Sequence, residues 1–341
     1  MLARSSALTH PSGVTLSTPL LVPSFSSKGF QFRRLDSGRQ VSEVATWMDI
    51  SSEALTETML VSAYDVFHKH IERPYKAKFV PQLAFLDSGG YEKSNAYDDS
   101  TVFKFPSSNL PWGKEKLFEV IESWSDRLPL IIVNFDLQGK SVRQQIEGAR
   151  DLFGHFPNHL NDFLLKPAGI RTQYLDRSMI LKHVTELRPF GILGFTEKEL
   201  GDSILDRMET IARIRLGLDK ELGSQACLIH IFGSLDPLTS CLYFASGAEI
   251  FDGLTWLRYA YQEGVAVYNS NYGATNIGIE KTEDFVRGRL LQDNLNYLTK
   301  LKYQMIEFVG TGDFMRLGGL GLIVQSAYAK LQERLGGGAG E

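Results

Sequence analysis

Short apolar segments alternate along the chain with stretches in which apolar residues recur at helical spacing. The apolar segments that have the length of buried strands are 19–25, 82–86, 130–135, 162–166, 190–194, 227–232 and 249–251. We expect a further, weaker strand near Leu290. The stretches with helical periodicity are 52–70, 114–124, 141–153, 175–187, 197–216, 237–246 and 254–262. Because strands alternate with helices in about eight repeats, the pattern predicts an α/β fold, the closed (β/α)8 or TIM barrel.

No low-complexity linker divides the chain, so we expect a single barrel domain over residues 1–341, with the glycine-rich 336–341 as a disordered tail. Two insertions interrupt the alternation. The first, 89–111, is rich in Ser, Asn, Asp and Pro, and the second, 264–278, is rich in Tyr, Asn and Gly. Each comes after a strand that ends in an aspartate, the first directly and the second one short helix later. Barrels build their active-site loops at such strand ends.

Composition narrows the classes of partner and compartment. No stretch approaches the ~20 apolar residues of a membrane helix, so we expect no membrane partner. The formal net charge is -4, and any contact with nucleic acid must therefore come from a local basic patch. Residues 1–7 contain Arg and Ser without acids, as transit peptides do, but no apolar core or cleavage site follows them. We expect a cytoplasmic protein.

The chain has two cysteines, Cys227 and Cys241, which are too far apart for a Cys-X-X-Cys pair. We therefore expect neither a disulfide framework nor a cysteine-rich zinc site. His230 lies three residues after Cys227, but in a strand such residues point to opposite faces, which disfavours joint metal binding. We expect neither a metal nor a cofactor.

Aspartates end several of the expected strands. Asp87 follows a buried strand and precedes two glycines, Asp252 ends a strand just before a helix, and Asp136 ends a third strand. Any one of them could cap a turn or a helix. Three carboxylates on the catalytic face of one barrel favour a functional site instead.

These motifs resemble the tRNA-guanine transglycosylases, including relatives that modify DNA. The most specific match is Asp-Ser-Gly-Gly-Tyr at 87–91, which the family carries after a strand. Residues 8–19 resemble the family's opening hairpin, and 229–238 followed by 247–252 resemble the helix and strand that lead to its nucleophile. The likeness extends to Asn-Leu-Asn-Tyr-Leu at 294–298, most of the chain.

The resemblance implies a glycosyltransferase, more narrowly a pentosyltransferase, that exchanges guanine for a 7-deazaguanine such as preQ0. Asp252 would be the nucleophile at C1′ and Asp87 the general acid/base. Tyr91 would stack on a base taken out of its stack, and Asp136 would accept hydrogen bonds from the purine edge. The other positions that the family uses are Ser88, Gly89, Gly191, Gly194 and Gly233 at the substrate and Arg258 at a phosphate. An equal alternative for the glycines of the segment 191–194 is that they ease close packing, and an equal alternative for Arg258 is a solvated arginine on a helix.

The chain departs from the family in three places. It lacks the Cys-X-Cys-X-X-Cys and His zinc subdomain that helps to dock RNA, it has Lys166 near a strand end where glutamine is usual, and Asp252 is not followed by a Pro-Thr-Arg turn. The lost subdomain tilts the expected substrate slightly from tRNA toward DNA. A glycoside or nucleoside hydrolase and a non-catalytic partner subunit are the alternatives. The sequence leaves open a homodimer or an accessory protein.

Overall fold

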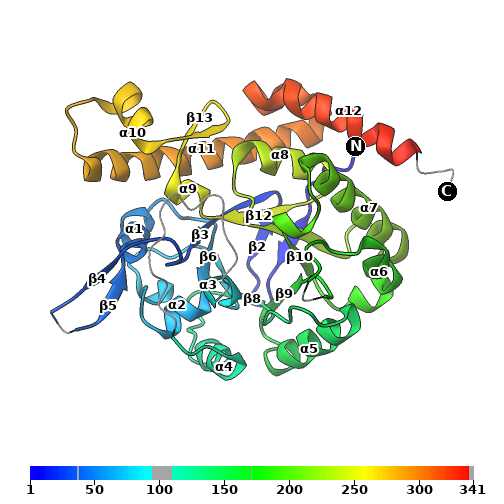
Figure 1. Cartoon of the computed structure of the whole chain (residues 1–341), viewed down its shortest axis with the longest axis horizontal. Helices are drawn as coiled ribbons and strands as arrows, with labels where there is room; N and C mark the ends of the chain where they lie inside the picture. Colours follow the sequence, from blue (N-terminus) through cyan, green and yellow to red (C-terminus); the bar gives the residue numbers. More distant parts are fainter. Residues whose placement is uncertain (37, 94–109, 170, 338–341) are drawn as a thin grey trace.

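Eight parallel strands close into a barrel in the computed structural model, which describes residues 1–36, 38–93, 110–169 and 171–337 (Figure 1). In order around the barrel they are β3 (Leu20–Phe25), β6 (Thr58–Ser62), β7 (Leu83–Asp87), β8 (Leu130–Val133), β9 (Leu160–Leu165), β10 (Ile192–Thr196), β11 (Leu228–Phe232) and β12 (Ile250–Gly253). The barrel closes where β12 pairs with β3. The (β/α)8 fold and all of the clear strands expected from the sequence are thereby confirmed.

The weak strand expected near Leu290 is wrong, because this residue lies inside the long helix α11 (Glu283–Thr311). The missing barrel strand is β6, which falls within the range 52–70 expected to be helical. All five residues of β6 are buried, and it lies between the helices α1 (Glu43–Ser51) and α2 (Ala63–Phe67). The helix expected over 254–262 is also shorter, since α9 (Thr255–Arg258) is followed by the strand β13 (Ala260–Gln262).

Alternate residues of the strands fill the barrel interior with apolar side chains, among them Val22, Leu60 and Phe85. One end of this interior is closed by a hairpin of β1 (Ala7–Thr9) and β2 (Thr15–Ser17). Leu8 and Leu16 of the hairpin belong to the same apolar cluster. The hairpin thus lies at the amino-terminal ends of the strands, and the opposite end, where the strands have their carboxyl-terminal ends, is called the mouth.

A ring of helices surrounds the barrel and buries the outer faces of the strands (Figure 1). After α1 and α2 the ring continues with α4 (Lys114–Glu122), α5 (Val142–His155), α6 (Arg177–Lys182), α7 (Ile204–Leu222), α8 (Pro237–Ala245) and α11. The short 3-10 helices are η1 (Pro74–Lys76), η2 (Val184–Leu187), η3 (Glu197–Glu199) and η5 (Phe314–Leu320). Capping boxes start α5 at Ser141 and α7 at Ser203, so their first backbone N–H groups are satisfied.

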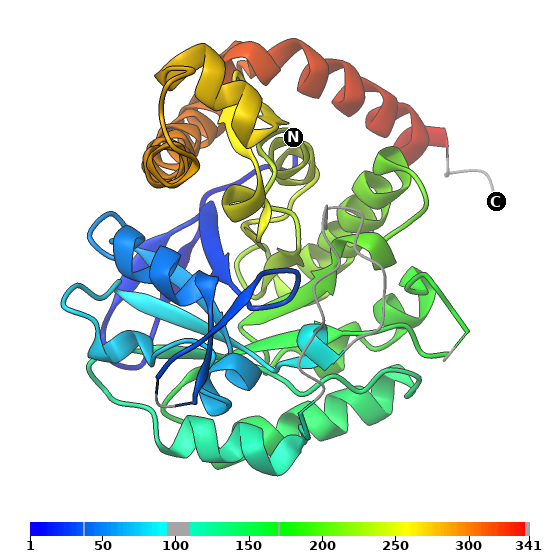
Figure 2. The same cartoon turned by 60° about the vertical axis from the view of Figure 1, so that its left-hand side comes forward.

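The last helix, α12 (Gly321–Gly337), packs against α7 and α8 on the outside of the ring, where Figures 1 and 2 also place the amino terminus. Because α12 runs to Gly337, the first two residues of the expected tail 336–341 are helical. Residues 338–341 lie outside the described ranges. No helix within those ranges is both long and apolar enough to cross a membrane.

Three segments are added to the (β/α)8 barrel. A hairpin of β4 (Phe32–Arg34) and β5 (Gln40–Ser42) precedes α1. The short helix α3 (Gly90–Lys93) follows β7, and most of the expected insertion 89–111 lies outside the described residues. The expected insertion 264–278 contains β14 (Val265–Val267), which pairs with β13, and then α10 (Asn269–Tyr272) and the π-helix η4 (Gly273–Ile277).

Candidate active site

The structure brings the three aspartates together at the barrel mouth. Asp87 is the last residue of β7, Asp252 lies near the end of β12, and Asp136 comes three residues after the end of β8. Asp87 is close enough to both of the other carboxylates to interact with them electrostatically. The site is therefore an acidic cluster at the ends of the strands, the usual position of a barrel's active site.

Asp252 is buried, with 5% of its surface exposed, and donors surround both of its carboxylate oxygens. Ser24 Oγ donates to Oδ2 at 2.7 Å, and the backbone N–H of Gly233 donates to Oδ1 at 3.1 Å. Gly233 has φ +80°, a conformation that favours glycine and turns its N–H toward the carboxylate. The sequence analysis expected Gly233 to contact the substrate. In the structure its N–H instead binds Asp252, the expected nucleophile.

A buried histidine also approaches Asp252. His230 Nε2 is 3.3 Å from Asp252 Oδ1, and His230 Nδ1 is 2.6 Å from Asp162 Oδ2. Burial alone would lower the pKa of His230, but the charge of Asp162, its hydrogen bond and Asp252 outweigh burial and raise that pKa to about 9. The sequence analysis did not assign Asp162 or His230 to the site.

Asp87 lies in a contrasting environment. Burial raises its pKa to about 7, and the charges of Asp136 and Asp252 add to the effect, against a hydrogen bond from the Gly89 N–H at 3.1 Å. A carboxyl group with this pKa exchanges a proton near neutral pH. The two aspartates at the mouth are therefore chemically distinct.

The Gly-Gly turn after Asp87 is required by close packing. Gly89 has φ +83°, and a Cβ on it would lie 2.7 Å from Tyr64 Cβ and 2.8 Å from Trp112 Nε1. A Cβ on Gly90 would collide with the carboxylate of Asp136. Ser88, in the same turn, donates from Oγ to Asp136 Oδ1 at 3.3 Å. The turn therefore brings Asp87 and Asp136 together, and it leaves no room for larger residues.

Glu92 is a second acid that the sequence analysis missed. It lies on α3, is buried, and accepts a hydrogen bond from Ser26 Oγ at its Oε1. Its Oε2 has no hydrogen-bond partner among the described residues. Burial raises the pKa of Glu92 to about 8, with contributions from the charges of Asp65 and Asp87.

Lys166 supplies a positive charge to the mouth, one residue beyond β9. Its Nζ donates to Thr196 Oγ1 at 2.7 Å and to Glu199 Oε1 at 3.2 Å. Burial lowers the pKa of Lys166, but the charges of Asp136 and Glu199 outweigh burial and raise it. Lys166 is therefore a fixed cation at the mouth.

Tyr91 and Arg258 meet at the rim of the mouth. Arg258 Nη2 donates to the backbone carbonyl of Lys28 at 3.1 Å and lies 3.4 Å from Tyr91 Oη. The ammonium of Lys28 lies 4.2 Å from the centroid of the Tyr91 ring and donates to the Tyr91 carbonyl. Arg258 is thus half-buried against other residues and does not extend from a solvated helix face.

Neither Gly191 nor Gly194 joins the mouth. Gly191 precedes the strand, and its N–H donates to Asn161 Oδ1 at 2.8 Å at the amino-terminal end of the barrel. The structure thus separates Gly191 from the other expected site residues. Gly194 lies within the strand, where a Cβ would be 2.5 Å from Phe232 Cε2 and 2.9 Å from Asp162 Oδ1. Gly194 therefore makes room for side chains that pack behind Asp252.

No group of three or more His, Cys, Asp or Glu side chains in the described ranges is arranged to hold a metal ion. Cys227 and Cys241 are both buried, and burial raises the pKa of the Cys227 thiol to about 12. No protein-family model matches the chain, and no curated protein matches it.

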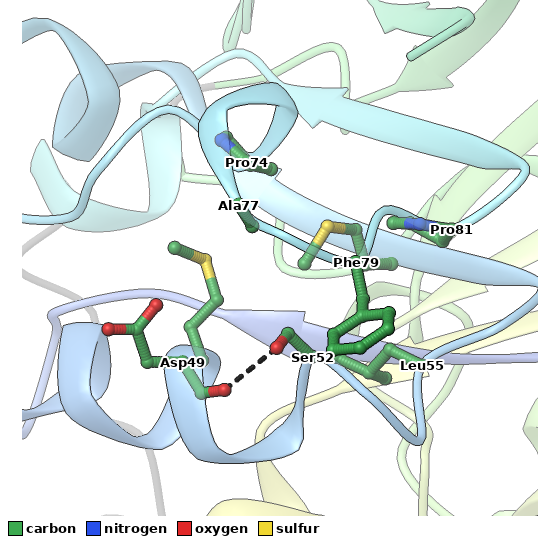
Figure 3. A pocket seen from close by; sticks show the side chains of 9 residues that line it. Asp49, Ser52, Leu55, Pro74, Ala77, Phe79 and Pro81 are labelled. Carbon is green, nitrogen blue, oxygen red and sulfur yellow. Dashed lines mark hydrogen bonds between the residues drawn. The ribbon is translucent and has the colours of Figure 1, made fainter. Parts of the chain in front are cut away.

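Two hollows lie outside the mouth. One, between the end of α1 and the segment 74–81, has a volume of about 10 Å³, room for one water molecule at most (Figure 3). The other is a groove of about 670 Å³ between η4 and α11. Its lining combines cations and aromatic rings: Tyr261, Tyr272, Lys281, Phe285, Arg289, Tyr297 and Lys300. Of these two hollows, the groove is large enough for part of a polymer.

Proposed function

We propose that the protein is a base-exchange transglycosylase, which replaces guanine in a polynucleotide with a 7-deazaguanine through a covalent glycosyl ester of Asp252. The observation that carries the proposal is the contrast between two aspartates at one mouth. Asp252 is surrounded by donors, as suits an attacking carboxylate, whereas burial places the pKa of Asp87 at about 7. Two carboxyl groups with separate roles are what a retaining substitution at an anomeric carbon needs.

The reaction has two steps of the same kind. In the first, Asp252 bonds C1′ while the bond from C1′ to guanine breaks, and Asp87 gives the departing base a proton. In the second, the incoming 7-deazaguanine bonds C1′, the ester bond breaks, and the Asp87 carboxylate takes a proton from the new base. Two inversions give net retention, and no cofactor is needed.

The residues around Asp87 and Asp252 have the hydrogen-bonding and stacking groups that a purine base needs. Asp136 supplies acceptor oxygens for a guanine-like N–H edge, and Lys166 supplies a donor for an acceptor on the same base. Tyr91 is an aromatic ring at the rim, held by Lys28 and Arg258, where an extruded base could stack. This combination favours base exchange over the hydrolysis of an unrelated glycoside.

A polynucleotide substrate also needs a surface for its backbone. Three cations, one carboxylate (Asp293) and several aromatic rings line the groove between η4 and α11, and two of the cations, Arg289 and Lys281, are paired with acids. Cations beside aromatic rings are the combination that binds single strands through phosphates and stacked bases. The groove includes Tyr261, three residues after Arg258. We favour DNA slightly over tRNA, because the chain lacks the cysteines of the family's RNA-docking zinc subdomain.

The test is the incorporation of labelled guanine, and of a labelled 7-deazaguanine, into a DNA duplex and into a tRNA transcript. Asp252→Asn should abolish incorporation, because an amide cannot form the glycosyl ester. Asp87→Asn should reduce turnover by roughly 10²-fold, the scale of lost acid/base catalysis. The Asp87 variant should still form a covalent adduct with a substrate that carries a good leaving group.

Denaturing gels separate the two roles, and thermal unfolding shows that both variants are folded. Near wild-type exchange by Asp252→Asn would refute the assignment of the nucleophile. An adduct that survives in Asp252→Asn and disappears in Asp87→Asn would mean that the roles are reversed. Release of guanine without uptake of a new base would indicate a hydrolase.

A further inference from the structure

His230 lies between two carboxylates inside the barrel. Its Nδ1 is 2.6 Å from Asp162 Oδ2, and its Nε2 is 3.3 Å from Asp252 Oδ1. Asp162 and His230 are fully buried, and Asp252 nearly so. A neutral imidazole has one N–H group, so one of its nitrogens would face a carboxylate with a lone pair. Burial raises the pKa of Asp162, but the charge and hydrogen bond of His230 oppose this, and with both carboxyl groups ionised only the imidazolium presents an N–H to each of them.

The fold is built around this contact. Asp162 on β9 and His230 on β11 are separated by β10, where Gly194 pairs with His230 and has no side chain to keep the two apart. The ring of Phe232 stacks on the imidazole with centroids 3.9 Å apart, and Phe85 meets its edge. Charged groups in an apolar interior are costly unless paired, so this arrangement serves more than packing.

Resting on the proposed function, we propose that Asp162 and His230 are positioning residues for Asp252, whose Oδ1 they hold while its Oδ2 bonds C1′. The Gly233 N–H donates to Oδ1, and His230 Nε2 lies 3.3 Å from the same oxygen as an ion-pair partner that forms no hydrogen bond with it, whereas Oδ2 accepts from Ser24. The imidazolium keeps its proton throughout both steps.

The charge of His230 affects the two steps unequally. When Asp252 attacks, its negative charge is lost to the ester, and the neighbouring cation opposes that loss. When the ester breaks, the electron pair of the C1′–O bond returns to Asp252, and the cation stabilises the returning charge. The pair therefore assists the breakdown of the intermediate more than its formation.

Asp162→Asn separates charge from packing, because the amide has nearly the same shape and can still hydrogen-bond Nδ1 of a neutral imidazole. We expect the variant to form the adduct with a labelled, guanine-containing oligonucleotide at a rate within a few-fold of wild type. Breakdown of the adduct after addition of free guanine should slow by roughly 10²-fold, the scale of a lost electrostatic donor. The adduct should consequently accumulate on denaturing gels.

His230→Gln is the second variant, and His10→Gln is the matched control. His10 is also a buried histidine, but it bonds the carbonyl of Leu130 at the closed end of the barrel. The control should change neither step. Equal slowing of both steps in Asp162→Asn, or wild-type breakdown in both variants, would overturn the positioning role.

Nitrogen NMR of labelled histidine tests the pair without any activity. In the wild type both ring nitrogens of His230, identified with His230→Gln, should be protonated at neutral pH, and Asp162→Asn should lower the pKa of this ring. A neutral His230 in the wild type would overturn the inference. If the protein exchanges no guanine in either polynucleotide while His230 is an imidazolium, the proposed function fails and the buried ion pair remains.

Discussion

Carboxyl groups crowd the barrel mouth more densely than cations. Asp136, Asp252 and Glu92 each interact electrostatically with Asp87, and the opposing charges are the buried Lys166 and the imidazolium of His230. Mutual repulsion and burial both favour protonated carboxyl groups, which is why the pKa values of Asp87 and Glu92 rise. Ionisation of these buried carboxyl groups therefore destabilises the folded state, by an amount that depends on pH.

Glu92 allows this cost to be measured away from the two reacting aspartates. Its pKa is about 8 in the fold and near 4.5 when unfolded. The folded state therefore binds the proton more tightly, and the stabilising contribution is complete below pH ~4.5 and is lost as the pH rises toward ~8. Glu92→Gln should stabilise the protein at pH 8 relative to wild type by a few kcal/mol, and much less at pH 5.

Urea unfolding at both pH values checks this prediction. Glu122→Gln is a suitable control, because Glu122 is exposed at the end of α4. The control should leave the free energy of unfolding unchanged within about 0.5 kcal/mol. A difference between Glu92→Gln and wild type that does not depend on pH would mean that Glu92 is ionised in the fold.

Residues at strand ends could be predicted from the sequence, whereas those inside the barrel could not. Asp87, Asp136 and Asp252 follow apolar runs, and barrel geometry alone brings such positions together. His230 and Asp162 lie within strands, and their pairing depends on which strands are two places apart and on the missing side chain of Gly194. The available signal was that both are polar residues at inward positions of apolar strands, where a partner is required.

Among the elements, β6 shows why local pattern was insufficient. Thr58 to Ser62 is a short apolar run directly between two helices, and such a run fits a buried helix turn as well as a strand. Completion of a closed barrel decides in favour of the strand. Leu290 illustrates the converse, because it repeats with Leu291, Leu295 and Leu298 on the buried face of α11.

Asn294 fastens α11 to the segment after the strand of Asp252. Its side chain donates to the carbonyls of Trp256 and Tyr259, each at 2.7 Å, and accepts from the Tyr261 N–H at 2.8 Å. Asn294→Ala would leave these buried backbone groups unsatisfied, at a cost of about 3 kcal/mol or more in the free energy of unfolding.

Denaturant unfolding of Asn294→Ala beside Asn296→Ala measures this cost. Asn296 lies on the same helix but is exposed, and it accepts a hydrogen bond from Gln292, one turn away. Its substitution should change stability by less than about 0.5 kcal/mol. Equal stability of the two variants would show that α11 is held by its apolar face alone.

At the scale of the whole molecule, the carboxyl-terminal part is tied to the barrel by apolar contacts. Leu295, Leu301, Met305 and Phe308 of α11 are buried in the same core cluster as Val324 of α12. Burial of such side chains contributes about 1.5–3 kcal/mol each, enough to fold this part without a metal knuckle.

This packing predicts the behaviour of the purified protein toward chelators. Elemental analysis should find clearly less than one metal ion per chain, and EDTA should leave the thermal unfolding temperature unchanged. Where a structural metal is present, its binding free energy is part of the folding free energy, so removal of the metal lowers that temperature sharply. A stoichiometric zinc whose removal unfolds the protein would therefore show that His and carboxylate side chains form a structural site, and that apolar burial does not hold the carboxyl-terminal part alone.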